Sequence, residues 1–206
     1  VEPLSKKPPL QNQRFKWWEH VTVHPGEGKD TMINASLVAI EINNCLPSME
    51  TPRGTEDYEG FYHLISMQGE VGEAKLNYIV RDHDKNGFEE RKKTLRLIEK
   101  NLNAKWGEGT VTLKITDQYL NMKEIVEEHM HLIDHAKKAC EAAGVAPLIL
   151  PIRGGTDGCQ LSFKGLPCPN LGTGGHAFHG PYEHISVEGM VKSVELLLAL
   201  IQEYTK

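Results

Sequence analysis

The stretch Ala74-Lys-Leu-Asn-Tyr-Ile-Val-Arg81 decides the fold class of the first half of the chain. Its even-numbered positions are all apolar, and its odd-numbered positions include a lysine, an asparagine and an arginine, which is the period of a half-buried β-strand. The preceding run, 61–68, is rich in aromatic and branched residues, and Gly69-Glu-Val-Gly72 between the two runs is a turn signal. We therefore expect a β-hairpin here.

Helices and shorter strands are predicted on both sides of this hairpin. Apolar residues recur at helical spacing over 31–46, and Asp84 is placed to cap a helix that runs to about residue 104. Alternating residues at 21–24 and 111–115 predict two outer strands. The order β-α-β-β-α-β is typical of a ferredoxin-like, four-stranded antiparallel sheet with two helices on one face, and we assign it to residues 18–118.

The remainder, 119–206, has the character of an α/β layer, so the whole chain belongs to the α+β or α/β class. We predict a helix that ends at Gly144, strands at 147–152 and 167–171, and a last helix that Ser186 caps. Two strands are few for a complete parallel sheet, and this region resembles half of a domain. The last helix is expected to turn these residues inward: Val187, Met190, Val191, Val194, Leu198 and Ile201.

Composition excludes several function classes. The chain has 206 residues and a formal charge of −5, which argues against a general nucleic-acid binder. Its apolar runs fall short of the roughly 18 residues of a membrane span, so we expect no membrane partner. The four cysteines lack the C-x-x-C spacing of a zinc knuckle and indicate reduced thiols in a cytoplasmic protein. Residues 1–17, with three prolines, are interpreted as a tail or linker.

Two glycine-rich segments are the first candidates for chemistry. In Arg153-Gly-Gly-Thr-Asp-Gly158 the glycines allow close approach to a ligand, the helix start offers amide groups, and the arginine can clamp a carboxylate. A tight turn without a ligand explains the same residues. His176 and His179 lie in a second such loop, where they serve as a metal ligand or proton carrier, or simply as polar surface.

Each of the other polar candidates can have a functional role or be an ordinary surface residue. His24 precedes a Pro-Gly turn, Arg81 ends a strand on its polar face, and Asn34 lies early in a helix. His131 and His135 have the i, i+4 spacing of zinc helices, but the glutamate of the H-E-x-x-H motif is absent. We interpret this histidine pair as a solvated helix face.

Several segments together resemble the dizinc exopeptidases, and specifically their peptidase T branch of cytosolic tripeptide aminopeptidases. They occur in order over about residues 21–203. The specific pieces are the arginine-glycine loop above and Gly165-Leu-Pro-Cys-Pro-Asn170. The others are Val23–Gly26, Lys29–Ala35, Tyr58–Leu64, Tyr78–Asp82, Gln160–Phe163, Thr173–Gly175 and Phe178–Gly180.

The resemblance implies a domain division and a role for each matching residue. Residues 18–118 would form a lid and dimerisation domain, and 119–206 the C-terminal part of an α/β catalytic domain. His179 matches a metal ligand, and His24 matches a lid histidine that polarises the scissile carbonyl in the partner subunit. The residues that match substrate-binding positions are Asn34, Arg81, Arg153, Gly155 and Thr156.

The resemblance also implies cofactors and partners. The family enzyme holds two zinc ions and hydrolyses the N-terminal residue of short peptides, and its lid forms a homodimer. The other metal ligands and the general base belong to an N-terminal half that this chain does not contain. We therefore expect a fragment that is inactive alone and does not bind the zinc pair fully, because even one catalytic zinc takes about three protein ligands. The alternative is a non-catalytic dimerisation or peptide-binding module.

Overall fold

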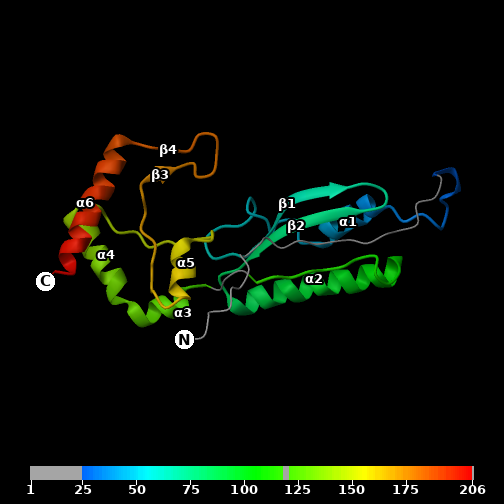
Figure 1. Cartoon of the computed structure of the whole chain (residues 1–206), viewed down its shortest axis with the longest axis horizontal. Helices are drawn as coiled ribbons and strands as arrows, with labels where there is room; N and C mark the ends of the chain where they lie inside the picture. Colours follow the sequence, from blue (N-terminus) through cyan, green and yellow to red (C-terminus); the bar gives the residue numbers. More distant parts are fainter. Residues whose placement is uncertain (1–24, 118–120, 206) are drawn as a thin grey trace, which may run out of the picture. The chain divides into compact units, whose positions relative to one another are not determined.

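A computed structural model describes residues 25–117 and 121–205 of the chain (Figure 1). The chain divides into two units, Val1–Gln118 and Tyr119–Lys206. The predicted tail at 1–17 and the predicted strand at 21–24 lie outside the described residues, as does His24.

The first unit is built on the predicted hairpin. Strand β1, Phe61–Gly69, runs antiparallel to β2, Ala74–Arg81, with Phe61 opposite Arg81 at one end and Gly69 opposite Ala74 at the other. The ladder shifts register between Leu64 and Ser66, where β1 has one extra residue. The hairpin prediction is confirmed.

Two helices flank the hairpin, and each begins at a capping side chain. Helix α1, Ala35–Cys45, starts where Asn34 accepts a hydrogen bond from the Leu37 amide. Helix α2, Lys85–Trp106, starts at Asp84, whose carboxylate accepts from the Gly87 amide at 2.7 Å, as predicted. A short 3₁₀ helix, η1, Pro25–Glu27, precedes them.

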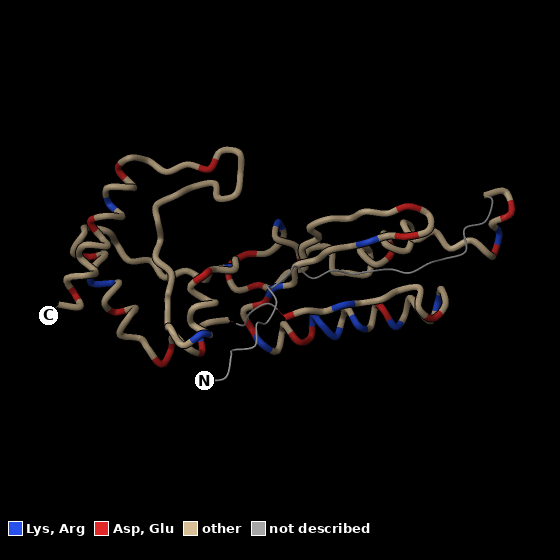
Figure 2. The backbone as a smooth tube through the Cα atoms, in the orientation of Figure 1, with Lys and Arg blue, Asp and Glu red and all other residues tan. Residues whose placement is uncertain are grey.

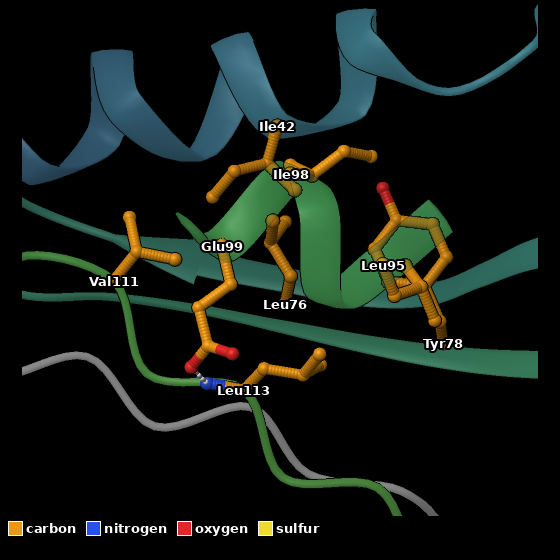
Figure 3. A pocket seen from close by; sticks show the side chains of 8 residues that line it. All are labelled: Ile42, Leu76, Tyr78, Leu95, Ile98, Glu99, Val111 and Leu113. Carbon is orange, nitrogen blue, oxygen red and sulfur yellow. Dashed lines mark hydrogen bonds between the residues drawn. The ribbon is translucent and has the colours of Figure 1, made fainter. Parts of the chain in front are cut away.

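The core of this unit lies between the hairpin and its two helices. The even-numbered positions of β2 are all apolar and buried on one face, and they share one cluster with the inward residues of α1 and α2. Leu76 is 1% exposed and Tyr78 2%, and both line a small apolar pocket (Figure 3). Its other lining residues are Ile42, Leu95, Ile98, Glu99, Val111 and Leu113.

The predicted strand at 111–115 is not confirmed, because this segment pairs with no strand among the described residues. Side chains of α2 bind the backbone amides of this segment: Val111 donates to Asn103 Oδ1 at 2.7 Å, and Leu113 donates to Glu99 Oε1 at 2.6 Å. The Glu99 bond is drawn in Figure 3. In the described part of this unit the sheet therefore has two strands rather than the four of the predicted ferredoxin-like arrangement.

Most of the regular secondary structure of the second unit is helical. Its helices are α3, Lys123–Val126, η2, Glu127–His129, α4, His131–Ala142, α5, Asp157–Ser162, and α6, Val187–Glu203. Helix α4 packs against α6. Gly144 takes the predicted position after α4 at φ +70°, a left-handed conformation that favours glycine. Ser186 caps α6 through a bond from the Gly189 amide, also as predicted.

Two strand predictions in this unit are wrong. Segments 147–152 and 167–171 are irregular, and the described sheet here is a two-residue ladder, β3, Gly175–His176, with β4, His184–Ile185. An apolar segment becomes a strand only when a neighbouring strand takes its backbone bonds. Within the described part of the chain, 147–152 has no such neighbour, and Leu148 is 77% exposed.

The expected inward face of α6 is exposed instead. The six apolar residues predicted to point inward are between 46% and 66% exposed, which is unusual for so long an apolar stripe. The two buried apolar side chains described in this unit are Ala139 and Cys159. None of the helices within 25–117 and 121–205 has the length and apolar character needed to cross a membrane.

We expect the stability of the first unit to depend on the ionisation of Tyr78 at high pH. Burial raises the pKa of its phenol from 10.0 to about 12. The unfolded chain releases this proton near pH 10, whereas the folded chain keeps it, so the contribution of Tyr78 to stability is complete below pH 10 and is lost as the pH rises toward 12. In urea titrations, the wild type should lose stability faster over this range than Tyr78→Phe; parallel pH profiles would contradict the expectation.

Candidate functional site

The predicted site residues of the first unit lie at element ends. Asn34 is half-buried, and its side-chain oxygen is engaged in capping α1. Arg81 is the last residue of β2, half-buried and opposite Phe61. It lies at an odd-numbered position of the strand, on the face opposite the core residues Tyr78 and Val80.

The predicted ligand loop of the second unit leads into α5. Thr156, rather than Asp157, is the N-cap, since its hydroxyl accepts from the Cys159 amide at 3.3 Å. Arg153 is half-buried, whereas Gly155 is exposed. The helix start expected after this loop is confirmed, and Thr156 is its capping residue.

This loop is bound to the Gly165–Asn170 segment by two side chains. Ser162 is buried; its hydroxyl donates to the Gly158 carbonyl at 2.8 Å and accepts from the Cys168 amide at 3.0 Å. Asn170 Nδ2 donates to Thr156 Oγ1 at 3.2 Å. A Cβ on Gly158 would lie 2.4 Å from the Cys168 carbonyl oxygen, so the close approach requires glycine. The two motifs most specific to the resemblance therefore form one packed structure.

His179 lies in the turn between β3 and β4. Its backbone has φ +64°, and its amide donates to the Glu183 carboxylate at 2.8 Å. The residue is exposed. At the base of this turn His176 stacks on His184, with ring centres 5.4 Å apart. The turn thus places His179 on the surface, held by its backbone.

The histidine pair on α4 has an environment only partly as predicted. His131 is exposed, but His135 is half-buried and contacts the Tyr204 ring edge-on, with centres 4.6 Å apart. Among the described residues no three His, Cys, Asp or Glu side chains group as a metal site would require. These residues by themselves do not fit a zinc pair.

Sequence reasoning missed the residues that hold the site residues in place. Ser162 and Asn170 bind the segments around Thr156, and Arg91 binds two carboxylates, one of them on Asp82 next to Arg81. The signal for Asn170 was available, because it ends a motif quoted for the resemblance. Ser162 also lies in a quoted segment, Gln160–Phe163, whereas Arg91 had no such signal, since its partner Glu50 is 41 residues away in the sequence.

Comparison with known proteins agrees with these motifs. The pattern of Peptidase family M20/M25/M40 matches residues 17–203. The chain belongs to this family. It is 51% identical over 184 residues to Peptidase T of Alkaliphilus oremlandii and 53% identical to Peptidase T of Clostridium novyi. Each alignment covers 89% of this chain and 45% of the relative, so this M20 chain spans less than half the length of the curated relatives it matches.

Solved structures agree on the fold. A tripeptidase from Staphylococcus aureus superposes with a TM-score of 0.72 at 18% identity, over 92% of this chain and 50% of that one. Aminopeptidase PepT from Bacillus cereus gives 0.68 at 19% identity, over 95% and 51%. The resemblance to the peptidase T branch, predicted from the motifs, is confirmed.

Proposed function

We propose that this M20 chain supplies the lid and the C-terminal part of the catalytic domain of a zinc-dependent tripeptide aminopeptidase. The observation that carries the proposal is the 53% identity to a Peptidase T along 184 residues. The packed pair of motifs around Thr156 supports it, because a loop held by Ser162 and Asn170 has the rigidity that a substrate pocket needs.

The matching residues receive the following roles in this proposal. Arg81 and Arg153 bind the terminal carboxylate of a short peptide, since a guanidinium pairs with a carboxylate through two parallel hydrogen bonds. Asn34, Gly155 and Thr156 line the pocket. His24 polarises the scissile carbonyl, and His179 is the one metal ligand from this chain.

Zinc requires donors beyond those described. His179 is one exposed imidazole, and the nearby Glu183 carboxylate accepts the His179 amide. Catalytic zinc takes about three protein ligands, so this part of the chain does not form the centre. We therefore expect the dialysed chain to keep much less than one zinc ion per molecule, as measured by atomic absorption. Two ions per chain would contradict this.

The cellular setting and assembly belong to the same proposal. A cytoplasmic location agrees with the four cysteines, which are all free thiols in the structure. A homodimer through the first unit agrees with its hairpin, whose β1 and β2 pair only with each other among the described strands and so leave outer edges.

Complementation tests the proposal. The chain is co-expressed with the part of Clostridium novyi Peptidase T that precedes its matched region, and hydrolysis of trialanine is followed with zinc present. The pair should release alanine, whereas either piece alone should not. Alanine release by this chain alone, if it survives a chelator control, would overturn the proposal that both pieces are required. A folded pair that binds trialanine without cleaving it would favour the non-catalytic binding module.

A further inference from the structure

Three charged side chains meet at the end of the hairpin where Arg81 lies. The Arg91 guanidinium binds the Asp82 carboxylate through Nε at 3.0 Å and the Glu50 carboxylate through Nη1. The side chains of Arg91 and Asp82 are 16% and 8% exposed. This Arg91 cluster joins α2, the end of β2 and the 47–60 loop.

Strand geometry places Arg81 and Asp82 on opposite faces. Side chains of consecutive strand residues alternate, and the residues buried toward the helices are Ala74, Leu76, Tyr78 and Val80. Asp82 continues this even-numbered series, and its buried side chain meets Arg91 of α2. The odd-numbered series, which ends at Arg81, faces away from the helices.

The surroundings fix the cluster tightly. A Cβ on Gly60 would lie 2.3 Å from Asp82 Oδ2 and 2.4 Å from Arg91 Nε, so there is no space for the carboxylate to move in that direction. The Tyr62 amide donates to the Glu50 carbonyl at 2.8 Å, which ties the loop to β1. The Arg91 guanidinium also lies over the Tyr62 ring, 5.2 Å from its centre.

Charge makes Arg91 difficult to replace. Burial lowers the pKa of its guanidinium, but the hydrogen bonds and charges of Glu50, Tyr62 and Asp82 outweigh burial and raise it. Removing this cation would leave the buried Asp82 carboxylate with the Asp84 amide, at 2.8 Å, but without a positive partner, which is energetically costly for a buried charge. Lysines, arginines and acids recur along the whole of α2, which supplies matched control positions (Figure 2).

We propose that Arg91 is a positioning residue for Arg81. By holding Asp82 on the helix side of the hairpin, Arg91 presents the Arg81 guanidinium on the opposite face and prevents the neighbouring carboxylate from competing with a ligand carboxylate. The inference rests on the proposed role of Arg81 in binding the peptide terminus. Because Arg91 lies on the helix side, its effect on the ligand passes through Arg81.

A double-mutant cycle tests the inference on the full chain. Calorimetry compares trialanine with trialanine amide, which lacks the terminal carboxylate. The wild type should prefer the free acid, and Arg91→Met should reduce that preference about tenfold, in keeping with a charged hydrogen bond. Arg91→Lys should restore part of it, and Arg96→Met, an exposed arginine of the same helix, should leave it unchanged. In the Arg81→Met background, Arg91→Met should have no further effect.

Two results separate the inference from the proposed function. If the wild type shows no preference for the free acid, the proposed role of Arg81 is wrong. The positioning by Arg91 is then tested with the ¹⁵Nε resonance of Arg81. This resonance is assigned as the one that disappears in Arg81→Met. Positioning requires that this resonance shift in Arg91→Met and not in Arg96→Met. An unmoved resonance, or equal weakening of acid and amide binding by Arg91→Met, overturns the inference.

Discussion

Leu76→Ala is expected to destabilise the first unit by about 3 kcal/mol, within the range of buried leucine truncations. Leu76 is 1% exposed and faces both helices in Figure 3, where it packs beside Ile42 and Ile98. The loss combines the burial energy of the deleted carbons with an enlarged cavity, because the hairpin and the two helices hold the walls apart. Urea unfolding followed by circular dichroism measures it.

The matched control for this prediction is Leu97→Ala. Leu97 is 56% exposed on α2, so the same deletion there should change stability by no more than about 0.5 kcal/mol. If the two variants unfold at the same urea concentration, the position of the core described for this unit is wrong.

Gly158→Ala is expected to separate α5 from the Gly165–Asn170 segment. Alanine usually stabilises a helix over glycine by about 0.5–1 kcal/mol. Here the new Cβ would lie 2.4 Å from the Cys168 carbonyl oxygen, and neither backbone can yield without breaking the Cys168–Ser162 hydrogen bond. We expect a loss of about 2–3 kcal/mol from overpacking and the lost bond together.

Hydrogen exchange at the Cys168 amide gives a local measure of this loss. The amide should exchange at least tenfold faster in Gly158→Ala than in wild type, since its partner hydroxyl is displaced. Gly172→Ala is the control, because a Cβ there meets no atom within 4 Å. Unchanged protection of Cys168 in Gly158→Ala would show that the two segments adjust without separating.

Local signals were enough to predict the helices and the hairpin. Asp84 and Ser186 begin helices where a capping side chain precedes an apolar pattern, and the strand at 74–81 pairs with 61–69, its neighbour along the chain. These features depend on neighbours within a few residues, so the sequence is sufficient for them.

Features that depend on distant partners could not be predicted in the same way. Segment 147–152 has the composition of a strand, but pairing decides whether a strand forms, and composition does not supply the partner. The Arg91 cluster joins residues 50, 82 and 91, and no local pattern brings these together. For the candidate site, the motifs indicated which residues to examine, while the side chains that hold them were visible only in three dimensions.

The outward-facing apolar stripe of α6 complicates any study of assembly. Its residues from Val187 to Ile201 can associate with a second copy, with a resin or with a dye without involving the hairpin. A dimer seen by ultracentrifugation therefore has two candidate origins. A charged substitution such as Val194→Lys blocks the stripe and leaves the hairpin intact, so only self-association that survives this change can be attributed to the first unit.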